Sequence, residues 1–463
     1  MILNAVAIFF LGSALCGAAT SIQMLIGGRV VQGIGGGGLI VLVQICIADL
    51  FSMRSRSAYY GIIGMVWAFA SGVGPIMGGV FTEKVTWRWC FYLNLPITGA
   101  VFFVILFFLK LTTPRTPLLK GLAAIDWLGS ITIIGGTLMF LLGLEFGGVT
   151  FPWHSATVIS LLAFGVFTLA VLFLIVEWKF AAYPVMPLRI FRRGSNIAAL
   201  LVCASHGFVF ISGSYYLPLY FQAVRGASPL LSGVYVLPFA LTLSLVSAVT
   251  GIIIKKTGRY LECMYFGLII MSLGFGLFID LDAHSSVAKI VLYQMVAGLG
   301  TGPLFQTPLL ALQAGVAPRD IATATGTFGF VRNLATSISV VVGGVIFQNG
   351  MNSQLPRLIA ALGSQTGHAL GGGSAGANVM LVKMLPGPQR EIARVAFASA
   401  LRKIWILYVC VGVAGLVASA FIRRQVLAKS HVETKTGLEA QKDHDVLLQR
   451  ARLEGKARPA GEV

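Results

Sequence analysis

The sequence predicts an all-α, polytopic membrane protein with about twelve transmembrane helices, and three observations support this fold class. Of its 463 residues, 57% are hydrophobic and only 11% are charged, whereas soluble globular proteins carry roughly 25% charged residues. Apolar runs long enough to cross a bilayer recur along most of the chain. Basic residues gather in alternate connections between these runs, as the positive-inside rule describes.

The helices are expected at the apolar runs, and polar or proline-containing connections separate them. In order, the expected helices cover residues 2–19, 23–48, 57–80, 88–110, 126–147, 155–178, 196–221, 229–254, 261–280, 285–314, 322–348 and 402–424. Two connections are longer than the others. We expect the proline-containing segment 111–125 to link two helix bundles, and 350–401 to be the one large non-cytosolic segment, in which the glycine-rich run 371–376 is flexible. Residues 391–402 fit an amphipathic helix that leads into the last span.

The distribution of charge predicts the orientation of the chain and argues against nucleic acid as a partner. The even-numbered connections carry Arg54, Arg56, Arg115, Lys120, Lys179, Arg189, Arg192, Arg193, Lys255, Lys256, Arg259 and Arg319. The opposite short connections carry only Lys84, Arg88 and Arg225. The first set is therefore expected to be cytosolic, together with both termini. The net charge of +18 arises in these loops, because the tail 425–463 holds seven basic and six acidic residues.

Cysteine usage and motif content predict neither a metal nor another cofactor. The six cysteines lie in or beside apolar segments without metal-ligand spacing, at positions 16, 46, 90, 203, 263 and 410. We expect buried free thiols rather than disulfides. Paired carboxylates, a His/Glu metal motif and a nucleophile elbow are not found in the spans, so an enzyme is not expected. The first basic residue is Arg29, so the charged start of a secretory signal peptide is not evident.

The second expected helix carries a charged residue inside an apolar span. It reads Gly27-Gly-Arg29-Val-Val-Gln32-Gly-Ile-Gly-Gly-Gly-Gly38. A buried arginine is costly in lipid, so Arg29 and Gln32 are candidates to face a cavity and couple to protons. The alternative is that Arg29 reaches back to the membrane interface. The glycine run does not end in Gly-Lys-Ser/Thr, which argues against a phosphate loop.

The third expected helix, over 61–79, is rich in small residues and contains a proline. Ala70, Gly74 and Gly78 recur every four residues and predict one smooth face, and Pro75 and Gly79 belong to a second stripe beside it. Small residues let helices approach closely in lipid. Pro75 removes a backbone hydrogen bond and permits a bend. The helix is either a packing face or a hinge that packs and flexes.

Few ionisable groups lie within the other spans. Glu145 is close to the end of its helix, where an interfacial role competes with a functional one. His206 is well inside the seventh span, where it either titrates or packs as a neutral, hydrogen-bonded side chain. Arg332 and Asn333 are far from both ends of the eleventh span, and the acceptors expected for Arg332 are Gln294, Gln306 and Gln313 on the tenth.

Gln306 lies between Pro303 and Pro308, which should loosen the tenth helix near the middle of the membrane. We therefore expect Gln306, Arg332 and Asn333 to face a central cavity. Aromatic residues of the seventh span either line this cavity or pack between helices. They are Phe208, Phe210, Tyr215, Tyr216, Tyr220 and Phe221.

These motifs together resemble the major facilitator superfamily. Arg29-x-x-Gln32-Gly33-x-Gly35 is similar to that family's fourth-helix motif. Gly61-x8-Ala70-x3-Gly74-Pro75-x2-Gly78-Gly79 resembles the fifth-helix motif of its antiporters, with Ala70 in place of a glycine. The run from Trp87-Arg88-Trp89 to Pro96 resembles the signature of the fourteen-helix drug:proton antiporters, and the overall texture is most similar to fungal pumps for drugs and toxins. Weaker matches are Asp126-Trp127-x-Gly129, Pro184-x-x-Pro187-Leu188-Arg189-x-Phe191, Tyr216-Leu217-Pro218 through Leu237-Pro238, and Gly298-x-Gly300-x-Gly302.

The resemblance implies two helical bundles joined by two extra linker helices. The expected parts are 1–111 with four of six amino-terminal spans, 112–194 with the two linker spans, 195–424 with six carboxy-terminal spans, and the cytosolic tail 425–463. The first two helices of the family then have no counterpart here, which predicts amino-terminal truncation. The segment from Gly251 through Lys255 and Gly258 to Arg259 resembles a cytosolic gate loop, although plain positive-inside anchoring explains the same residues.

The activity implied by this resemblance is export of small amphipathic drugs or toxins in exchange for protons, by alternating access. The expected protein is a monomer without a cofactor in the plasma membrane, with a vacuolar or vesicle membrane as the alternative location. Two alternatives stay open: a carrier for siderophores or other metabolites, and a truncated membrane protein that transports nothing.

Overall fold

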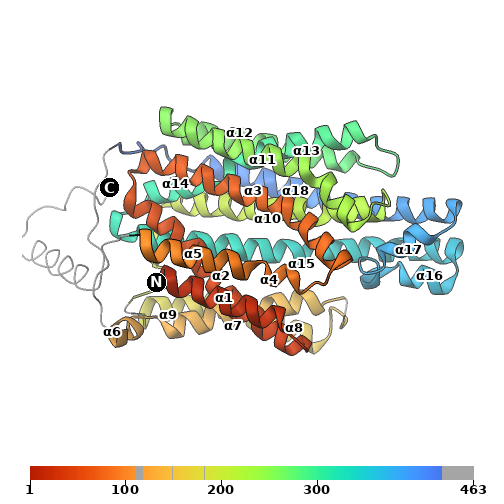
Figure 1. Ribbon diagram of the computed structural model, residues 1–463, viewed down its shortest axis with the longest axis horizontal. Coiled ribbons are helices and arrows are strands. Elements are labelled where there is room, and N and C mark those ends of the chain that lie inside the picture. The colour runs from red at the N-terminus through yellow and green to blue at the C-terminus, as the bar shows by residue number, and fades with distance from the viewer. Residues whose placement is uncertain (110–117, 149, 182, 430–463) are drawn as a thin grey trace, which may run out of the picture.

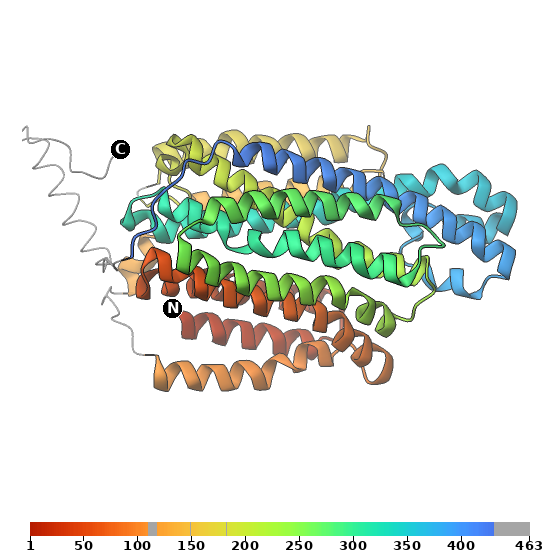
Figure 2. The same ribbon diagram turned by 90° about the horizontal axis from the view of Figure 1, so that it is seen from above.

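A computed structural model describes residues 1–109, 118–148, 150–181 and 183–429 (Figure 1). These residues form helices and connecting turns, and the single β-bridge among them joins Gly147 to Phe151. The helices run roughly parallel to one long axis, as the views in Figures 1 and 2 show. The all-α membrane fold is therefore confirmed for the described part of the chain. The predicted tail 425–463 lies outside it beyond residue 429.

The amino-terminal helices are α1 Ile2–Gly17, α2 Ile22–Leu50, α3 Met53–Lys84, α4 Trp89–Tyr92 and α5 Asn94–Phe108. Ser21 and Ser52 begin α2 and α3, and their hydroxyls accept hydrogen bonds from the backbone N–H groups of Met24 and Ser55. Such caps satisfy donors that a helix start leaves unpaired.

The linker helices are α6 Leu118–Ala123, α7 Trp127–Phe146, α8 Ala156–Phe167 and α9 Phe173–Lys179. One π-helical turn, η1 Thr168–Leu172, joins α8 to α9, so that Ala156–Lys179 forms a single span. Asp126 caps α7 by accepting a hydrogen bond from the N–H of Gly129 at 2.7 Å. A short 3-10 helix, η2 Leu188–Arg192, leads on to the rest of the chain.

The carboxy-terminal bundle contains the remaining helices, and some of its spans are interrupted. They are α10 Gly194–Ala223, α11 Pro229–Thr257, α12 Tyr260–Leu277, η3 Phe278–Asp280, α13 Val287–Thr301, η4 Gly302–Phe305, α14 Thr307–Ala314, η5 Pro318–Asp320, α15 Ile321–Leu362, α16 Ser364–Ala369, η6 Gly372–Ser374, α17 Val379–Met384 and α18 Gly387–Ser419. The break at η4 agrees with the expected loosening beside Gln306.

Eleven helices in the described residues are long and apolar enough to cross a membrane, and α1 is a shorter apolar helix of 16 residues. The twelve predicted spans are thus all present as helices, with α1 the shortest. The connection predicted over 350–401 is shorter in the structure, because α15 continues to Leu362 and α18 already begins at Gly387. Between them, the glycine-rich run is folded, with Gly372 at φ +52° and Ala375 fully buried. Residues 350–401 form a lobe, called the far lobe below, that extends beyond the other helices in Figure 2.

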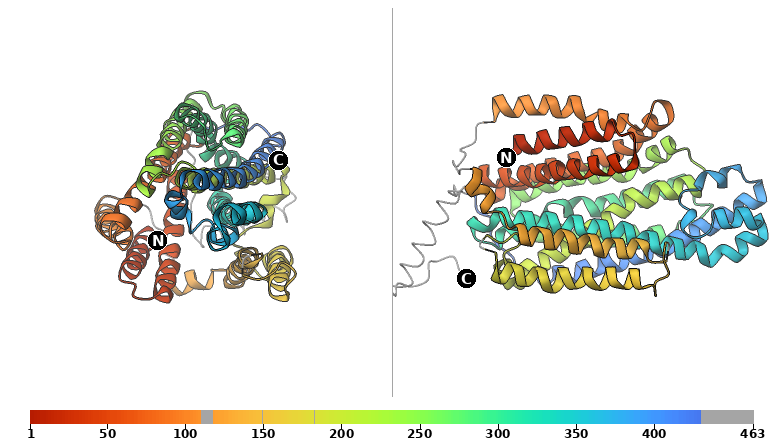
Figure 3. Two further views of the ribbon diagram at one scale, coloured as in Figure 1. Left: turned by 90° about the vertical axis from the view of Figure 1, so that its right-hand side faces the viewer. Right: turned by 90° about the horizontal axis from the view of Figure 1, so that it is seen from below.

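The buried core lies almost wholly in the carboxy-terminal bundle. Its large buried side chains come from 190–427, and Tyr60 is the only core member from the amino-terminal helices in the described part of the chain. A much smaller cluster of Ile133, Phe173 and Met186 joins the linker helices. The end-on view in Figure 3 shows the amino-terminal helices and the linker helices as separate groups beside the carboxy-terminal bundle. The site therefore has to be sought where these groups meet.

Candidate functional site between the helix bundles

The amino-terminal helices contact the carboxy-terminal bundle mainly through α3, which runs antiparallel along α11. Glycines make this approach possible. A Cβ atom at Gly64 would lie 2.1 Å from Ser247 Oγ, and one at Gly72 would lie 2.8 Å from Ala240 Cβ. At the far end, a Cβ at Gly79 would come within 3.3 Å of Leu230 N. At Gly72 the contact is with a Cβ that cannot rotate away, so a side chain there would force the helices apart. At Gly64 the Ser247 hydroxyl can rotate, but Ser247 Cβ at 3.2 Å leaves no room for a side chain larger than a methyl group.

The predicted packing stripe on α3 is wrong. A Cβ at Gly74 or Gly78 would meet no atom within 4 Å in the described structure, and Ala70 is exposed. The close contacts instead follow Gly61, Gly64, Gly72 and Gly79; of these, the predicted motif contains Gly61 and Gly79 but not Gly64 or Gly72. Pro75 lies within α3, but the surroundings of its side chain fall outside the described residues.

At one end of this interface, side chains of α3 bind the backbone of α11. Arg54 Nε donates to the Lys255 carbonyl oxygen at 2.7 Å, and Arg54 Nη2 donates to the next carbonyl, of Lys256. The last carbonyls of a helix lack partners within it, so a guanidinium is a natural cap. Ser57 Oγ adds a bond to the Gly251 carbonyl oxygen at 3.2 Å.

The residues of the predicted gate loop therefore act mainly through the backbone. A Cβ at Gly251 would lie 2.6 Å from the Ser57 carbonyl oxygen, which explains the glycine. Gly258 ends α11 with φ +76°, a left-handed conformation that glycine adopts without strain. The side chains of Lys255 and Arg259 are exposed. Sequence reasoning found this segment but not Arg54, its partner on α3.

A buried polar network lies one turn further inside. Gln313 Nε2 donates to Tyr60 OH and to Thr325 Oγ1, both at 3.0 Å. Tyr60 OH in turn donates to the Gln44 carbonyl oxygen at 3.2 Å. These contacts join α2 and α3 to α14 and α15. Beside them, Arg56 Nη2 donates to the Ala48 carbonyl oxygen at 2.5 Å.

Next to this network is a small cavity of about 20 Å³ between the two groups of helices. It is lined by Gln44, Tyr60, Ile63, Gly64, Trp67, Phe305, Leu309 and Arg332. The lining comes from α2, α3, η4, α14 and α15, and it combines aromatic rings with polar side chains. A volume of this size holds about one water molecule. Ligand pockets for drug-sized molecules are about 300–1,000 Å³, so the helices must separate to admit one.

Arg332 is the one charged side chain in the described lining of this cavity, and its polar side-chain partner behind the lining is His206. Arg332 Nη2 lies 2.9 Å from His206 Nδ1, and the guanidinium carbon lies 4.7 Å from the centroid of the Phe305 ring. Arginine can only donate, so Nδ1 must accept, and this bond assigns His206 as the neutral tautomer with its proton on Nε2. In the described structure no carboxylate forms an ion pair with Arg332. The acceptors predicted for Arg332 are wrong, because Gln294, Gln306 and Gln313 all bond elsewhere.

Gln306 follows the break between η4 and α14 and is 1% exposed. Its Nε2 donates to the Ser247 carbonyl oxygen on α11 at 2.8 Å. Its Oε1, His206 Nε2, Ser247 Oγ and Gln44 Oε1 have no partner among the described residues. Buried polar groups rarely go unpaired. Three of them, Gln44 Oε1, Gln306 Oε1 and Ser247 Oγ, lie beside α3 and therefore indicate a place where water or a ligand can bind.

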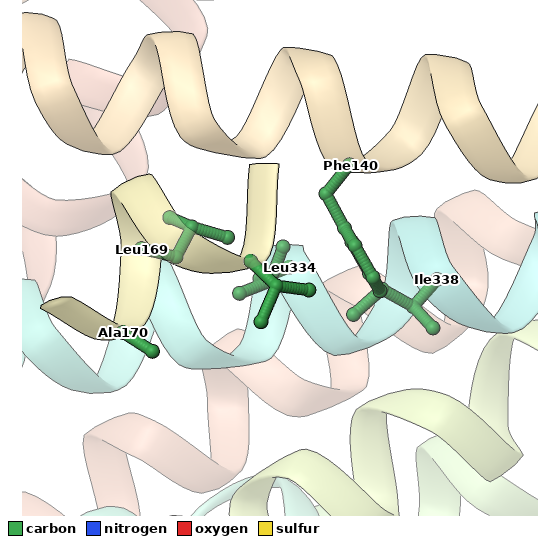
Figure 4. A pocket seen from close by; sticks show the side chains of 6 residues that line it. Phe140, Leu169, Ala170, Leu334 and Ile338 are labelled. Atoms are coloured by element: carbon green, nitrogen blue, oxygen red, sulfur yellow. The ribbon is translucent and has the colours of Figure 1, made fainter. Parts of the chain in front are cut away.

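Asn333 is exposed and does not line the cavity, although it follows Arg332 directly. The next residue along α15 faces a different feature. Leu334 and Ile338 line a wide, open and apolar hollow of about 350 Å³ against the linker helices, together with Phe140, Val166, Leu169 and Ala170 (Figure 4). It offers neither charge nor convergent polar groups, so it fits lipid hydrocarbon better than a specific ligand.

Two other candidate groups lie outside the cavity. Arg29 Nη1 donates to Gln32 Oε1 at 2.7 Å, and Gln32 Nε2 donates to Ser13 Oγ on α1 at 2.8 Å. Arg29 is exposed and also lies over the Phe91 ring, 5.8 Å from its centroid. Glu145 is exposed one residue before the end of α7. The structure therefore brings together Arg332 and His206, with Gln306 directly after the cavity residue Phe305, but not Arg29, Gln32 or Glu145.

Most aromatic residues of α10 serve packing. Tyr216 is 2% exposed and Tyr220 is 1% exposed, and their hydroxyls donate to the carbonyl oxygens of Val340 and Asp282, each at 2.7 Å. Phe210 is closer to the cavity, since its ring centroid lies 5.0 Å from that of Phe305. Sequence reasoning missed the lining residues Gln44, Tyr60, Trp67 and Phe305. A polar Gln44 in an apolar span was the one available signal.

The profile of the family described as Major Facilitator Superfamily matches residues 1–340. The chain is 54% identical over 445 residues to "Efflux pump dotC" of Dothistroma septosporum, covering 96% of this chain and 76% of that protein. It is 46% identical to "MFS-type transporter ppz2" of Metarhizium majus, covering 95% and 76%. The crystal structure of the human organic anion transporter MFSD10 shares the fold, with TM-score 0.50, 15% identity and 89% and 76% coverage. The profile matches more than half of the chain, and the relatives are covered over most of their length. The chain therefore belongs to the Major Facilitator Superfamily.

Proposed function

We propose that this protein is a secondary active transporter that exports small amphipathic molecules in exchange for protons. The observation that carries the proposal is the cavity at Arg332. It lies between two groups of helices, contains a charged centre, and is next to an interrupted helix, as substrate sites of transporters commonly are. The 54% identity to a protein named an efflux pump supports export rather than uptake.

The movement we propose is a rocking of α3 against α11. The hydrogen bonds from Arg54 and Ser57 to α11, together with the network of Tyr60 and Gln313, hold one end of the interface closed. Each such bond contributes about 1 kcal/mol, so breaking several is within reach of substrate binding. Opening this end exposes the cavity to one side of the membrane, and closing it lets the other end open.

His206 is the group that we assign to proton coupling. A neutral imidazole accepts a hydrogen bond from Arg332, whereas a protonated one places two cations side by side. Proton binding would therefore break this pair and free Arg332 to move. A negative-inside membrane potential favours each entering proton by about 2.3 kcal/mol per 100 mV. We further propose that the end with Arg54 is cytosolic, as are both termini, and that the protein works as a monomer in the plasma membrane.

The test is transport by the purified full-length chain in proteoliposomes. A pH gradient, acid inside the vesicles, should drive accumulation of amphipathic fluorescent probes such as rhodamine 6G and 1-hydroxy-2-naphthoate. A protonophore should abolish the accumulation of every probe that the protein carries. If no probe from a broad panel moves and no proton flux follows its addition, the non-transporting alternative is correct. Uptake of an iron chelate without movement of these probes would instead identify a siderophore carrier.

A further inference from the structure

The charge at the cavity points to the chemistry of its ligand. Arg332 carries a permanent positive charge within the membrane-spanning part of α15, and its only polar side-chain partner in the described structure is the neutral ring of His206. An arginine within a membrane is costly unless an anion or several acceptors compensate it. A ligand that brings a negative charge would remove this cost, whereas a cationic ligand would increase it.

The rings around Arg332 indicate the shape of the ligand. Phe305 lies against the guanidinium at 4.7 Å, with Phe328 on another side at 5.8 Å. Tyr60 and Trp67 of α3 complete the lining from the opposite group of helices. Aromatic walls favour flat aromatic ligands, because rings stack on each other and on guanidinium planes.

Unpaired acceptors add a third requirement. Gln306 is 1% exposed, and its Oε1 has no donor among the described residues. Gln44 Oε1 on the opposite helix is likewise unpaired. Gln44 lines the cavity, and Gln306 directly follows the lining residue Phe305, so a ligand hydroxyl group would pair with Gln44 Oε1 better than a purely apolar molecule would.

We propose that the cavity binds flat aromatic molecules that carry an acidic oxygen, a phenolate or carboxylate, held by Arg332, together with a hydroxyl donor. This proposal rests on the export function proposed above and narrows its substrates. The acidic oxygen replaces His206 as the partner of Arg332, and the ring lies against Phe305. The helices must open to admit such a molecule, because the cavity has a volume of only about 20 Å³.

The experiment measures binding, so it does not depend on transport. The full-length protein in lipid nanodiscs is titrated with three probes of matched shape: 1-hydroxy-2-naphthoate, its neutral primary amide, and cationic 1-naphthylmethylammonium. Calorimetry should show that the anion binds at least tenfold more tightly than the amide, and that the cation binds weakest. Equal affinity of all three probes, or tightest binding by the cation, would overturn the proposal.

Variants then assign the preference to Arg332. Arg332→Gln should reduce the ratio of anion to amide affinity to about one, and Arg332→Lys should keep part of it. Arg357→Gln is the matched control, since Arg357 is an exposed arginine on the same helix near its far end. Each variant is used only if its size-exclusion profile and helical content match the parent. A folded Arg332→Gln variant that still prefers the anion would show that another group supplies the charge. Binding with the predicted preference but without transport would contradict only the export function.

Discussion

The carboxy-terminal bundle and the amino-terminal helices are similarly apolar but are covered by the rest of the chain to very different degrees. In the most apolar part of the α13–α14 span 83% of residues are buried within the protein, against 17% in α2, although α2 has the higher mean hydropathy, 2.0 compared with 1.2. An apolar side chain that faces lipid gains no hydrophobic free energy by packing against protein instead, so hydrophobicity does not predict burial within the protein. Small residues and polar groups, which fix close contacts, are better guides.

The largest expected effect on transport comes from substitutions on the face of α3 that contacts α11, compared with its other face. Gly64→Val should reduce transport to background, because its side chain would collide with Ser247 and hold α3 away from α11. Gly74→Val should retain transport, since a Cβ there meets nothing within 4 Å. The measurement is probe accumulation in proteoliposomes at equal protein content. Loss of transport in both variants would mean that the face of Gly74 packs during the cycle.

His206→Asn should lower proton-driven accumulation at least tenfold while leaving probe binding nearly unchanged. The Asn amide oxygen can accept from Arg332, but the amide does not take up a proton at working pH. Accumulation is compared with and without an imposed pH gradient. An unchanged response to the gradient would remove His206 from coupling.

Tyr60→Phe should have an intermediate effect, because it leaves Gln313 and the Gln44 carbonyl short of a partner. The expected loss is about 1–2 kcal/mol of contact between the two groups of helices. A lower melting temperature in detergent and faster labelling of a cysteine that replaces Ile63, which lines the cavity, would report this opening. As a control, Tyr215→Phe removes a hydroxyl from an exposed ring. Equal labelling rates in the two variants would contradict the claim that the Tyr60 hydroxyl helps to hold the two groups of helices together.

Arg29→Ala should have the smallest effect, with transport within about threefold of the parent. Arg29 is exposed and bonds Gln32 of its own helix, so its removal costs little more than a surface contact. Initial rates of probe accumulation across a range of gradients are the measurement. Complete loss of proton dependence would instead show that Arg29 takes part in proton coupling, as expected of a residue that faces the cavity.

Sequence alone could predict the helices, the family and the candidates Gln306, Arg332 and His206, of which Arg332 lines the cavity, because each depends on a local pattern. Apolar runs mark spans, two prolines beside Gln306 mark a broken helix, and Arg332 and His206 stand out as polar groups in lipid. The pairing of Arg332 with His206 joins residues 126 positions apart and depends on how α10 and α15 pack. The contact face of α3 depends likewise on its partner. Glycines lie on two faces of α3, one with Gly61, Gly64, Gly72 and Gly79 and one with Gly74 and Gly78, so the presence of glycine alone cannot choose between Gly64 and Gly74.

Because α15 is long, a small tilt near Arg332 produces a large displacement at its far end. Its 42 residues extend for roughly 63 Å at about 1.5 Å per residue, about twice the hydrocarbon thickness of a bilayer. Arg332 lies 30 residues before its last residue, Leu362, a distance of about 45 Å. A tilt of roughly 5° about Arg332 would therefore sweep the far lobe through about 4 Å. The position of a fluorophore on that lobe would then report the opening and closing of the cavity, although the fluorophore lies far from it.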